Sequence, residues 1–279
     1  MTTLKSSKPL KDKVREFWDA DPCGTRDLQH GSDFQSHAEK RYSREPFIKQ
    51  FANFSSAREK NVLEIGVGMG ADYVEWLKAG AYATGVDLSE VSLSRARRRS
   101  ELQGYRPALT VADAENLPFV DNTFDIVYSY GVMHHSPDTQ KCIDEALRVL
   151  KPGGEIRLML YHNPSLTGLM LWLRFGLISA RSIRQTVYHH LESPGTKSFS
   201  AHEVQTMMGG FRDINTRVVF SPGDLLMNTS SAKFQGSFYR AIWRLYPRAL
   251  VKRFCKQLGL FMLVSAQKPT ADQSRPDYA

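Results

Sequence analysis

The sequence has few cysteines and no long uninterrupted apolar run. Its 279 residues include only Cys23, Cys142 and Cys255, which are far apart and form no Cys-x-x-Cys pair. That count argues against a disulfide framework and against a structural zinc site, so we expect no bound metal and a cytoplasmic location. The most apolar stretch, residues 166–180, is interrupted by Arg174 and is too short to span a bilayer.

Signals of targeting and of repeat architecture are also lacking. Residues 1–13 are polar and Lys-rich, so we expect no secretory signal peptide. No internal repeat is visible. Hydrophobic residues make up 42% of the chain and charged residues 24%, as in ordinary globular proteins. The length is ample for a buried core, and disorder is expected only at the two ends.

The formal net charge is +8. Such a basic balance suits an acidic partner, such as nucleic acid, anionic lipid or an anionic substrate, but it also suits a plain solvated surface. Four cations recur every four residues within a basic amphipathic helix that we expect over 237–257: Arg240, Arg244, Arg248 and Lys252. Peripheral membrane contact through this helix stays open, as does a monomer or a homodimer.

Strand and helix patterns alternate through the middle of the chain, which predicts an α/β fold with a doubly wound, mostly parallel sheet. Helix starts are expected at Ser89, at Ser136–Pro137 and at Ser200, where Glu203 completes a capping box. The strands are expected at 62–65, 83–86, 108–112, 124–129, 155–161, 214–220 and 260–266.

The segment 162–198, after the fifth strand, reads as irregular. An insertion at the carboxyl edge of a sheet is placed to cover a ligand. We hypothesise that its apolar side chains line a pocket for an apolar or aromatic small molecule, the alternative being that they pack the cover on the core. These side chains are Leu166, Leu169, Met170, Leu171, Trp172, Leu173, Phe175, Leu177 and Ile178.

A glycine turn follows the first strand, in the segment Glu64-Ile65-Gly66-Val67-Gly68-Met69-Gly70. Glycines let a ligand lie against bare main chain, and the helix that follows favours an anionic group. Asp87 closes the second strand, where an acid can accept hydrogen bonds from both hydroxyls of a ribose. Asp113 closes the third strand, where an acid can accept from an adenine amine. Together these positions indicate a nucleoside site.

These motifs resemble the class I S-adenosylmethionine-dependent methyltransferases, in the branch with small-molecule and quinone-type methylases. The resemblance runs from about residue 60 to 161, and it implies a Rossmann-like seven-stranded sheet whose last strand is antiparallel. It also implies an N-terminal helical lid at 1–55, a core at 56–161 and 199–279, and a substrate cover at 162–198. The matching motifs are 62–70, 85–89, 113–119, 124–127 with 132–135, and 145–154.

The resemblance also implies roles for single residues, with S-adenosylmethionine as the cofactor. Asp87 would bind the ribose and Leu88 would lie against the adenine, whose edge Asp113 and Ala114 would read. Tyr130 would lie near the carboxylate or sulfonium end, and Tyr42, with Phe17–Trp18, would belong to the lid. The methionine part would be held by Glu64, Gly66, Gly68 and Gly70.

An O, N or C nucleophile is then methylated by in-line displacement, and a base is needed only if the nucleophile is protonated. His134 and His135 are best placed for that role, with Tyr161 and His162 as second choices, although a histidine here can also simply order the loop. Because Gly66-x-Gly68-x-x-Ala71 fits a dinucleotide fingerprint, an NAD(P)-dependent oxidoreductase is an alternative. An RNA- or tRNA-modifying methyltransferase, an RNA-binding protein and a noncatalytic binding module are the others.

Overall fold

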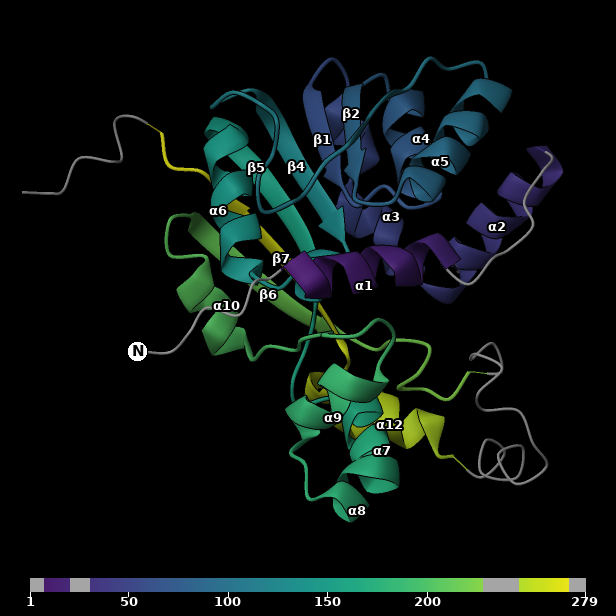
Figure 1. Ribbon diagram of the computed structural model, residues 1–279, viewed down its shortest axis with the longest axis vertical. Coiled ribbons are helices and arrows are strands. Elements are labelled where there is room, and N and C mark those ends of the chain that lie inside the picture. Colours follow the sequence, from purple (N-terminus) through teal and green to yellow (C-terminus); the bar gives the residue numbers. More distant parts are fainter. Residues whose placement is uncertain (1–7, 21–30, 228–245, 271–279) are drawn as a thin grey trace, which may run out of the picture.

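The computed structural model describes residues 8–20, 31–227 and 246–270 (Figure 1). One sheet of seven strands runs in the order β3-β2-β1-β4-β5-β7-β6. Strands β1 to β5 pair in parallel, and β7 runs antiparallel to both β5 and β6. The expected doubly wound, Rossmann-like sheet with an antiparallel last strand is thereby confirmed. The strands are β1 Asn61–Ile65, β2 Tyr82–Asp87, β3 Ala108–Val111, β4 Phe124–Tyr130, β5 Leu150–Tyr161, β6 Arg212–Val219 and β7 Phe261–Gln267.

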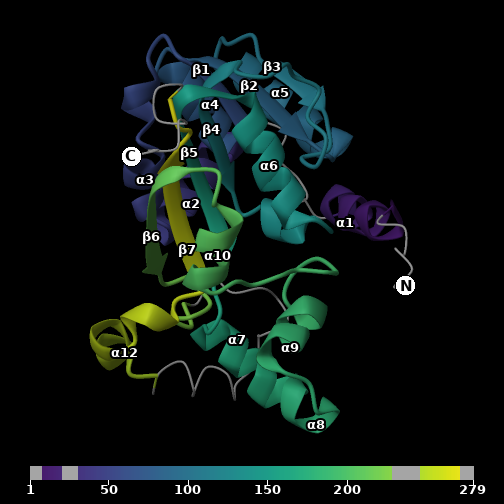
Figure 2. The ribbon, with the colours of Figure 1, turned by 90° about the vertical axis from the view of Figure 1, so that its left-hand side faces the viewer.

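Helices cover both faces of the sheet (Figure 2). α6 and α10 pack their apolar side chains on one face, and α4, α5 and η2 pack on the other. The helical elements are α1 Lys8–Ala20, α2 Gly31–Arg44, α3 Phe47–Ala52, η2 Phe54–Ala57, α4 Ala71–Lys78, α5 Glu90–Leu102, η3 Met133–His135, α6 Thr139–Val149, α7 Leu166–Leu171, η4 Trp172–Gly176, α8 Leu177–Ser179, α9 Ile183–His190, α10 Ala201–Met207, α12 Arg248–Phe254 and η6 Lys256–Leu258.

Two of the three expected helix starts are confirmed. Ser89 caps α5 by accepting from the Ser92 backbone N–H, and Ser200 caps α10 in a capping box with Glu203. The expected start at Ser136–Pro137 is wrong, because the N-cap of α6 is Asp138, whose carboxylate accepts from a backbone N–H one turn on. The Ser136 hydroxyl donates to the Glu115 carboxylate and accepts from the Asp138 N–H, two residues before the cap bond of α6.

The expectation that residues 162–198 are irregular is also wrong. The segment holds α7, η4, α8 and α9. The first three form one continuous helix, and its middle part, η4, is a π-helix. The start signals were in the sequence: Ser165 caps α7, and Ser182 with Gln185 forms a capping box on α9. These helices project beyond the carboxyl ends of the strands, together with α12 (Figures 1 and 2).

Of the basic helix expected over 237–257, the structure describes α12 at Arg248–Phe254. Arg240 and Arg244 lie outside the described residues. Within the described ranges, none of the helices combines the length and the apolar character needed to cross a bilayer.

Candidate active site

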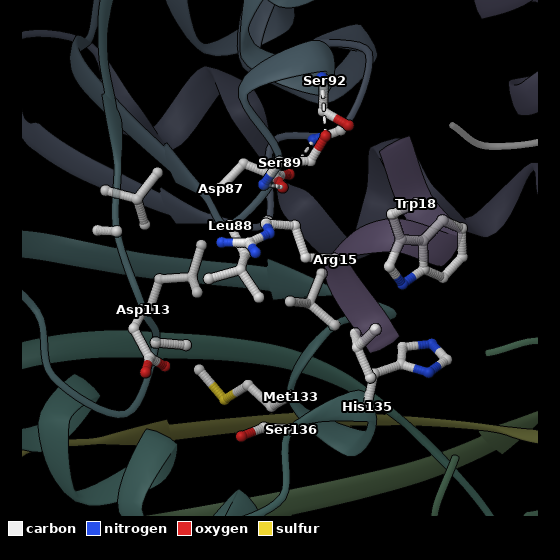
Figure 3. A pocket seen from close by; sticks show the side chains of 18 of the residues that line it. Arg15, Trp18, Asp87, Leu88, Ser89, Ser92, Asp113, Met133, His135 and Ser136 are labelled. Carbon is white, nitrogen blue, oxygen red and sulfur yellow. Dashed lines mark hydrogen bonds between the residues drawn. The ribbon is translucent and has the colours of Figure 1, made fainter. Parts of the chain in front are cut away.

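A cavity opens at the carboxyl edge of the sheet, between β1 and β4. The strand order reverses there, and ligands bind at such switch points in open α/β sheets. The space measures about 950 Å³ when its open mouth is included. The strand ends and loops after β1, β2, β3 and β4 form its walls. Helix α1 crosses these strand ends and forms a further side (Figures 1 and 3).

The structure brings most of the expected site residues together in this cavity. The expected residues that line it are Gly66, Gly68, Asp87, Leu88, Asp113, Ala114, Tyr130 and His135. Five others lie behind or beside the walls: Glu64, Gly70, Tyr42, His134 and Tyr161. None of the apolar side chains of α7, η4 and α8 is in the lining, so the structure does not place the hypothesised apolar pocket here.

Two glycines of the turn have different structural roles. Gly66 has φ +79°, and a Cβ added there would come within 2.1 Å of the Val132 side chain, which lines the opposite wall. Only glycine fits that approach without strain. Gly70 has φ +72°, and its added Cβ would meet Ala96 at 2.9 Å. Gly70 therefore allows α4 to pack closely on α5, and Gly66 allows the turn to pack closely on the loop after β4.

Glu64 lies directly behind the turn, at 3% exposure. Its Oε2 atom has no hydrogen-bond partner among the described residues. Burial, and then the negative charge of Asp72, raise the pKa of the Glu64 carboxyl well above its usual range. A buried polar atom without a partner is costly, and the Trp76 side chain, whose indole N–H is also buried without a partner, lowers the pKa of Glu64 in part.

Asp87 and Asp113 face the cavity from neighbouring strand ends (Figure 3). One Asp87 oxygen accepts the Gly68 N–H at 2.8 Å and the other accepts the Ser89 N–H at 2.9 Å. Burial raises the pKa of Asp87, although these backbone N–H groups work against it. Asp113 accepts the Glu115 N–H at 2.9 Å and faces Lys11 at 2.6 Å. Both carboxylates keep further lone pairs for a ligand.

Helix α1 supplies three lining residues that the sequence reading did not assign to the site, Lys11, Val14 and Arg15, and also Trp18, which it assigned to the lid. Lys11 Nζ bridges Asp113 at 2.6 Å and Glu115 at 2.5 Å. The signal was the spacing of Lys11, Arg15 and Trp18, which puts all three on one helix face. Gly131 and Val132, after β4, were also missed as lining residues.

Tyr42 lies outside the cavity, in a buried polar network. Its hydroxyl donates to Asp72 Oδ1 at 2.9 Å, Tyr128 donates to Asp72 Oδ2 at 2.9 Å, and Arg41 pairs with Asp72 at 2.7 Å. Burial alone would raise the pKa of Asp72, but Arg41 and these donors outweigh burial and hold it below the usual value. The network joins α2 to α4 directly behind the glycine turn.

His135 is the histidine that reaches the cavity. Its Nδ1 atom lies 2.8 Å from Ser193 Oγ and 3.1 Å from Thr196 Oγ1, and its Nε2 atom lies 3.5 Å from a Glu192 carboxylate oxygen. Thr196 donates its own hydroxyl to the Ser193 carbonyl. With the proton on Nδ1, the ring donates to Thr196; with the proton on Nε2, the ring donates to Glu192 and Nδ1 accepts from Ser193.

Two of the other three candidates for a base, His134 and Tyr161, have different surroundings. Both ring nitrogens of His134 are buried without a partner among the described residues, and burial lowers its pKa well below the usual value. Its ring packs 3.9 Å from the Tyr161 ring. The Tyr161 hydroxyl donates to Glu192 at 2.7 Å, and burial raises its pKa well above the usual range. His134 therefore stays neutral, and Tyr161 keeps its proton.

Residues 63–158 match the model of a family described as a methyltransferase domain. This part of the chain is therefore similar to methyltransferase domains, in agreement with the resemblance seen in the motifs. The chain is also 31% identical over 196 residues to glycine/sarcosine/dimethylglycine N-methyltransferase of Actinopolyspora halophila, which covers 66% of this chain and 33% of the relative.

Norajmaline N-methyltransferase of Rauvolfia serpentina is 35% identical over 124 residues, or 42% of each chain. The chain thus spans less than half the length of both curated relatives. Among solved structures, phosphoethanolamine N-methyltransferase 2 of Haemonchus contortus, in complex with S-adenosyl-L-methionine, superposes with a TM-score of 0.58 at 20% identity. That match covers 92% of this chain and 60% of the other, and it shows a shared fold.

Proposed function

We propose that this chain, which is similar to methyltransferase domains over residues 63–158, transfers a methyl group from S-adenosylmethionine to an O, N or C nucleophile of a small, apolar or aromatic molecule. The observation that carries the proposal is the cavity at the switch point, where the glycine turn and two strand-end acids converge. A dinucleotide fingerprint accounts for Gly66 and Asp87 but not for Asp113 on the third strand.

The residues present fit this cofactor. The unpartnered Glu64 oxygen suits a cationic amine, because a charged donor compensates a buried carboxylate. Asp87 suits two ribose hydroxyls and Asp113 an exocyclic amine, while Gly66 and Gly68 leave bare main chain between them. Leu88 and Ala114 supply apolar contacts, and Tyr130 lines the same cavity with an aromatic ring.

When bound, S-adenosylmethionine supplies a methyl group already activated by a sulfonium. The chain then has to orient the nucleophile, exclude water and accept a proton where the nucleophile carries one. α1 excludes water by crossing the cavity, with Lys11 tied to Asp113 and the Trp18 ring 5.4 Å from the His135 ring. We assign the proton to His135, since the Glu192 carboxylate beside its ring stabilises the resulting imidazolium.

The acceptor side of the cavity supports an apolar or aromatic substrate. Val14, Trp18, Val132 and Met133 line it, and Tyr130 adds an aromatic face. Two of the relatives are named N-methyltransferases, so amines come first among the acceptors to be tried. Phenols, quinols and a structured RNA complete the panel.

The test is transfer of labelled methyl from S-adenosylmethionine to this panel. His135→Asn should lower kcat by about 10²- to 10⁴-fold with unchanged cofactor affinity, as for a lost general base. The matched control is His189→Asn, an exposed histidine outside the cavity lining, which should behave as the parent protein. Cofactor binding without transfer to any acceptor, or transfer to RNA alone, would contradict the small-molecule proposal.

A further inference from the structure

The helices beyond the carboxyl edge form what we call the distal lobe: α7, η4, α8 and α9, with α12 (Figures 1 and 2). Residues 162–198 and 246–258, which contain it, hold eight lysines and arginines and one acidic residue, Glu192. Their formal charge is therefore +7, against +8 for the whole chain. Nearly all of the net charge is concentrated in the part of the molecule farthest from β1 to β3.

The same lobe exposes large apolar side chains. On the continuous helix 166–179, Ile178 is 90% exposed, and Leu173 and Leu177 are more than half exposed. Leu169, Leu173 and Leu177 recur every four residues, so they form one stripe that ends at Ile178. On α12, Leu250 and Phe254 are also four residues apart, and Phe254 is 73% exposed. Single exposed apolar residues are ordinary, but such a concentration marks an interaction surface.

Cations stand among these apolar residues. On α12, Lys252 lies between Leu250 and Phe254 in the sequence, and Arg253 lies over the Phe254 ring at 5.6 Å. Lys252, Arg253 and Lys256 form no ion pair within the described ranges. By contrast, Arg184 on α9 pairs with Glu203 at 2.5 Å. Lys252, Arg253 and Lys256 are therefore available to an external anion.

We propose that the distal lobe docks on an anionic lipid surface, with its apolar side chains in the headgroup boundary and its cations on the lipid phosphates and carboxylates. Interfacial helices combine these two features. The charge argues against a second copy of the chain as the occupant, because two lobes of +7 would repel each other. Leucine and isoleucine offer no stacking face to an RNA base, so RNA fits the cations but leaves the stripe exposed.

The test is sedimentation of the full chain with vesicles of phosphatidylcholine alone and of phosphatidylcholine with phosphatidylserine. Binding is expected only to the second kind and should weaken with added salt. Leu173→Gln with Leu177→Gln and Ile178→Gln should lower the partition coefficient by about tenfold or more. Lys252→Gln with Lys256→Gln should lower it by a similar factor of about tenfold.

Matched controls carry the same chemical changes elsewhere. Tyr82→Gln with Val120→Gln removes exposed apolar side chains outside the lobe, and Lys60→Gln with Arg98→Gln removes exposed cations there. Both should bind vesicles like the parent protein. Failure of the parent protein to bind phosphatidylserine vesicles would overturn the proposal. So would salt-sensitive RNA binding in place of lipid binding, or a dimer that the triple glutamine variant dissociates.

Discussion

Two neighbouring buried carboxylates, Asp72 and Glu64, differ in their hydrogen-bond partners, and their pKa values are shifted in opposite directions. Asp72, behind the glycine turn, receives Arg41, Tyr42 and Tyr128, and its pKa is held low. Glu64, in front of it, keeps one oxygen without a partner among the described residues, and its pKa is raised. A fully bonded acid stabilises the fold, whereas a buried acid left incomplete is a position for a ligand.

The same contrast extends to the cavity. Asp87 and Asp113 are held by backbone N–H groups that fix their direction but leave oxygen lone pairs facing the open space. We therefore expect changes at Asp72 to alter stability and changes at the cavity acids to alter ligand affinity. Four substitutions test that division, from the largest expected effect to the smallest.

Asp72→Ala should lower the free energy of unfolding by about 3–5 kcal/mol, because it leaves the Arg41 charge without its buried partner. Urea denaturation measures this loss. The double variant Asp72→Leu with Arg41→Met should recover a large part of it, since it removes both charges. A stable Asp72→Ala protein with impaired cofactor binding would show that Asp72 acts like the ligand-binding acids. That result would contradict the division between stabilising and ligand-binding carboxylates.

Asp87→Ala should weaken S-adenosylmethionine binding by about 1.5–3 kcal/mol for each lost charge-assisted hydrogen bond, with one or two bonds lost. Asp87→Asn is the finer variant, because an amide oxygen can still accept from the Gly68 N–H and preserve the turn. Calorimetric titration gives the affinity. Unchanged affinity in both variants removes Asp87 from the site.

Glu64→Gln should weaken cofactor binding by about 1.5–3 kcal/mol, the value of a hydrogen bond to a charged group, without lowering stability. The pH dependence has a definite sign. The raised pKa favours the protonated form of Glu64 in the free protein, whereas a bound amine favours the carboxylate. Affinity should therefore rise as pH increases from the usual carboxyl range through the raised pKa, and this rise should vanish in Glu64→Gln.

Lys11→Met should have the smallest effect, about 1 kcal/mol or less in stability, because Lys11 is partly exposed and its ion pairs compete with water. Its expected signature is easier proteolysis of α1. Lys78→Met, which removes an exposed pair with Glu75, is the control and should leave α1 as resistant as in the parent protein. A loss as large as that of Asp72→Ala would show that the two ion pairs are equivalent.

The strand ends were predictable from sequence because their positions are local. A buried strand followed by a glycine or an acid places Gly66, Asp87 and Asp113 at one edge of any parallel sheet. The helices of 162–198 were missed although their caps, at Ser165 and Ser182, are local signals. The apolar run between the caps drew attention to burial, yet Leu173, Leu177 and Ile178 are exposed.

Long-range partners could not be predicted in the same way. The sequence places His134 and His135 together, but only the fold shows that His135 meets Ser193, Thr196 and Glu192, some sixty residues on. Likewise, Tyr42 looks like any aromatic on an amphipathic helix until Asp72 is seen beside it. Such contacts depend on how α1, α2 and residues 162–198 pack against the sheet edge, and no local pattern specifies that packing.

The most direct test of the central claim is calorimetric titration of the protein with S-adenosylmethionine and, separately, with NAD(P)H. Our account predicts binding of S-adenosylmethionine and none of NAD(P)H, with the affinity reduced in Glu64→Gln and retained in Tyr42→Phe, which lies outside the cavity. Binding of NAD(P)H, or S-adenosylmethionine binding that is indifferent to Glu64 and sensitive to Tyr42, would contradict it.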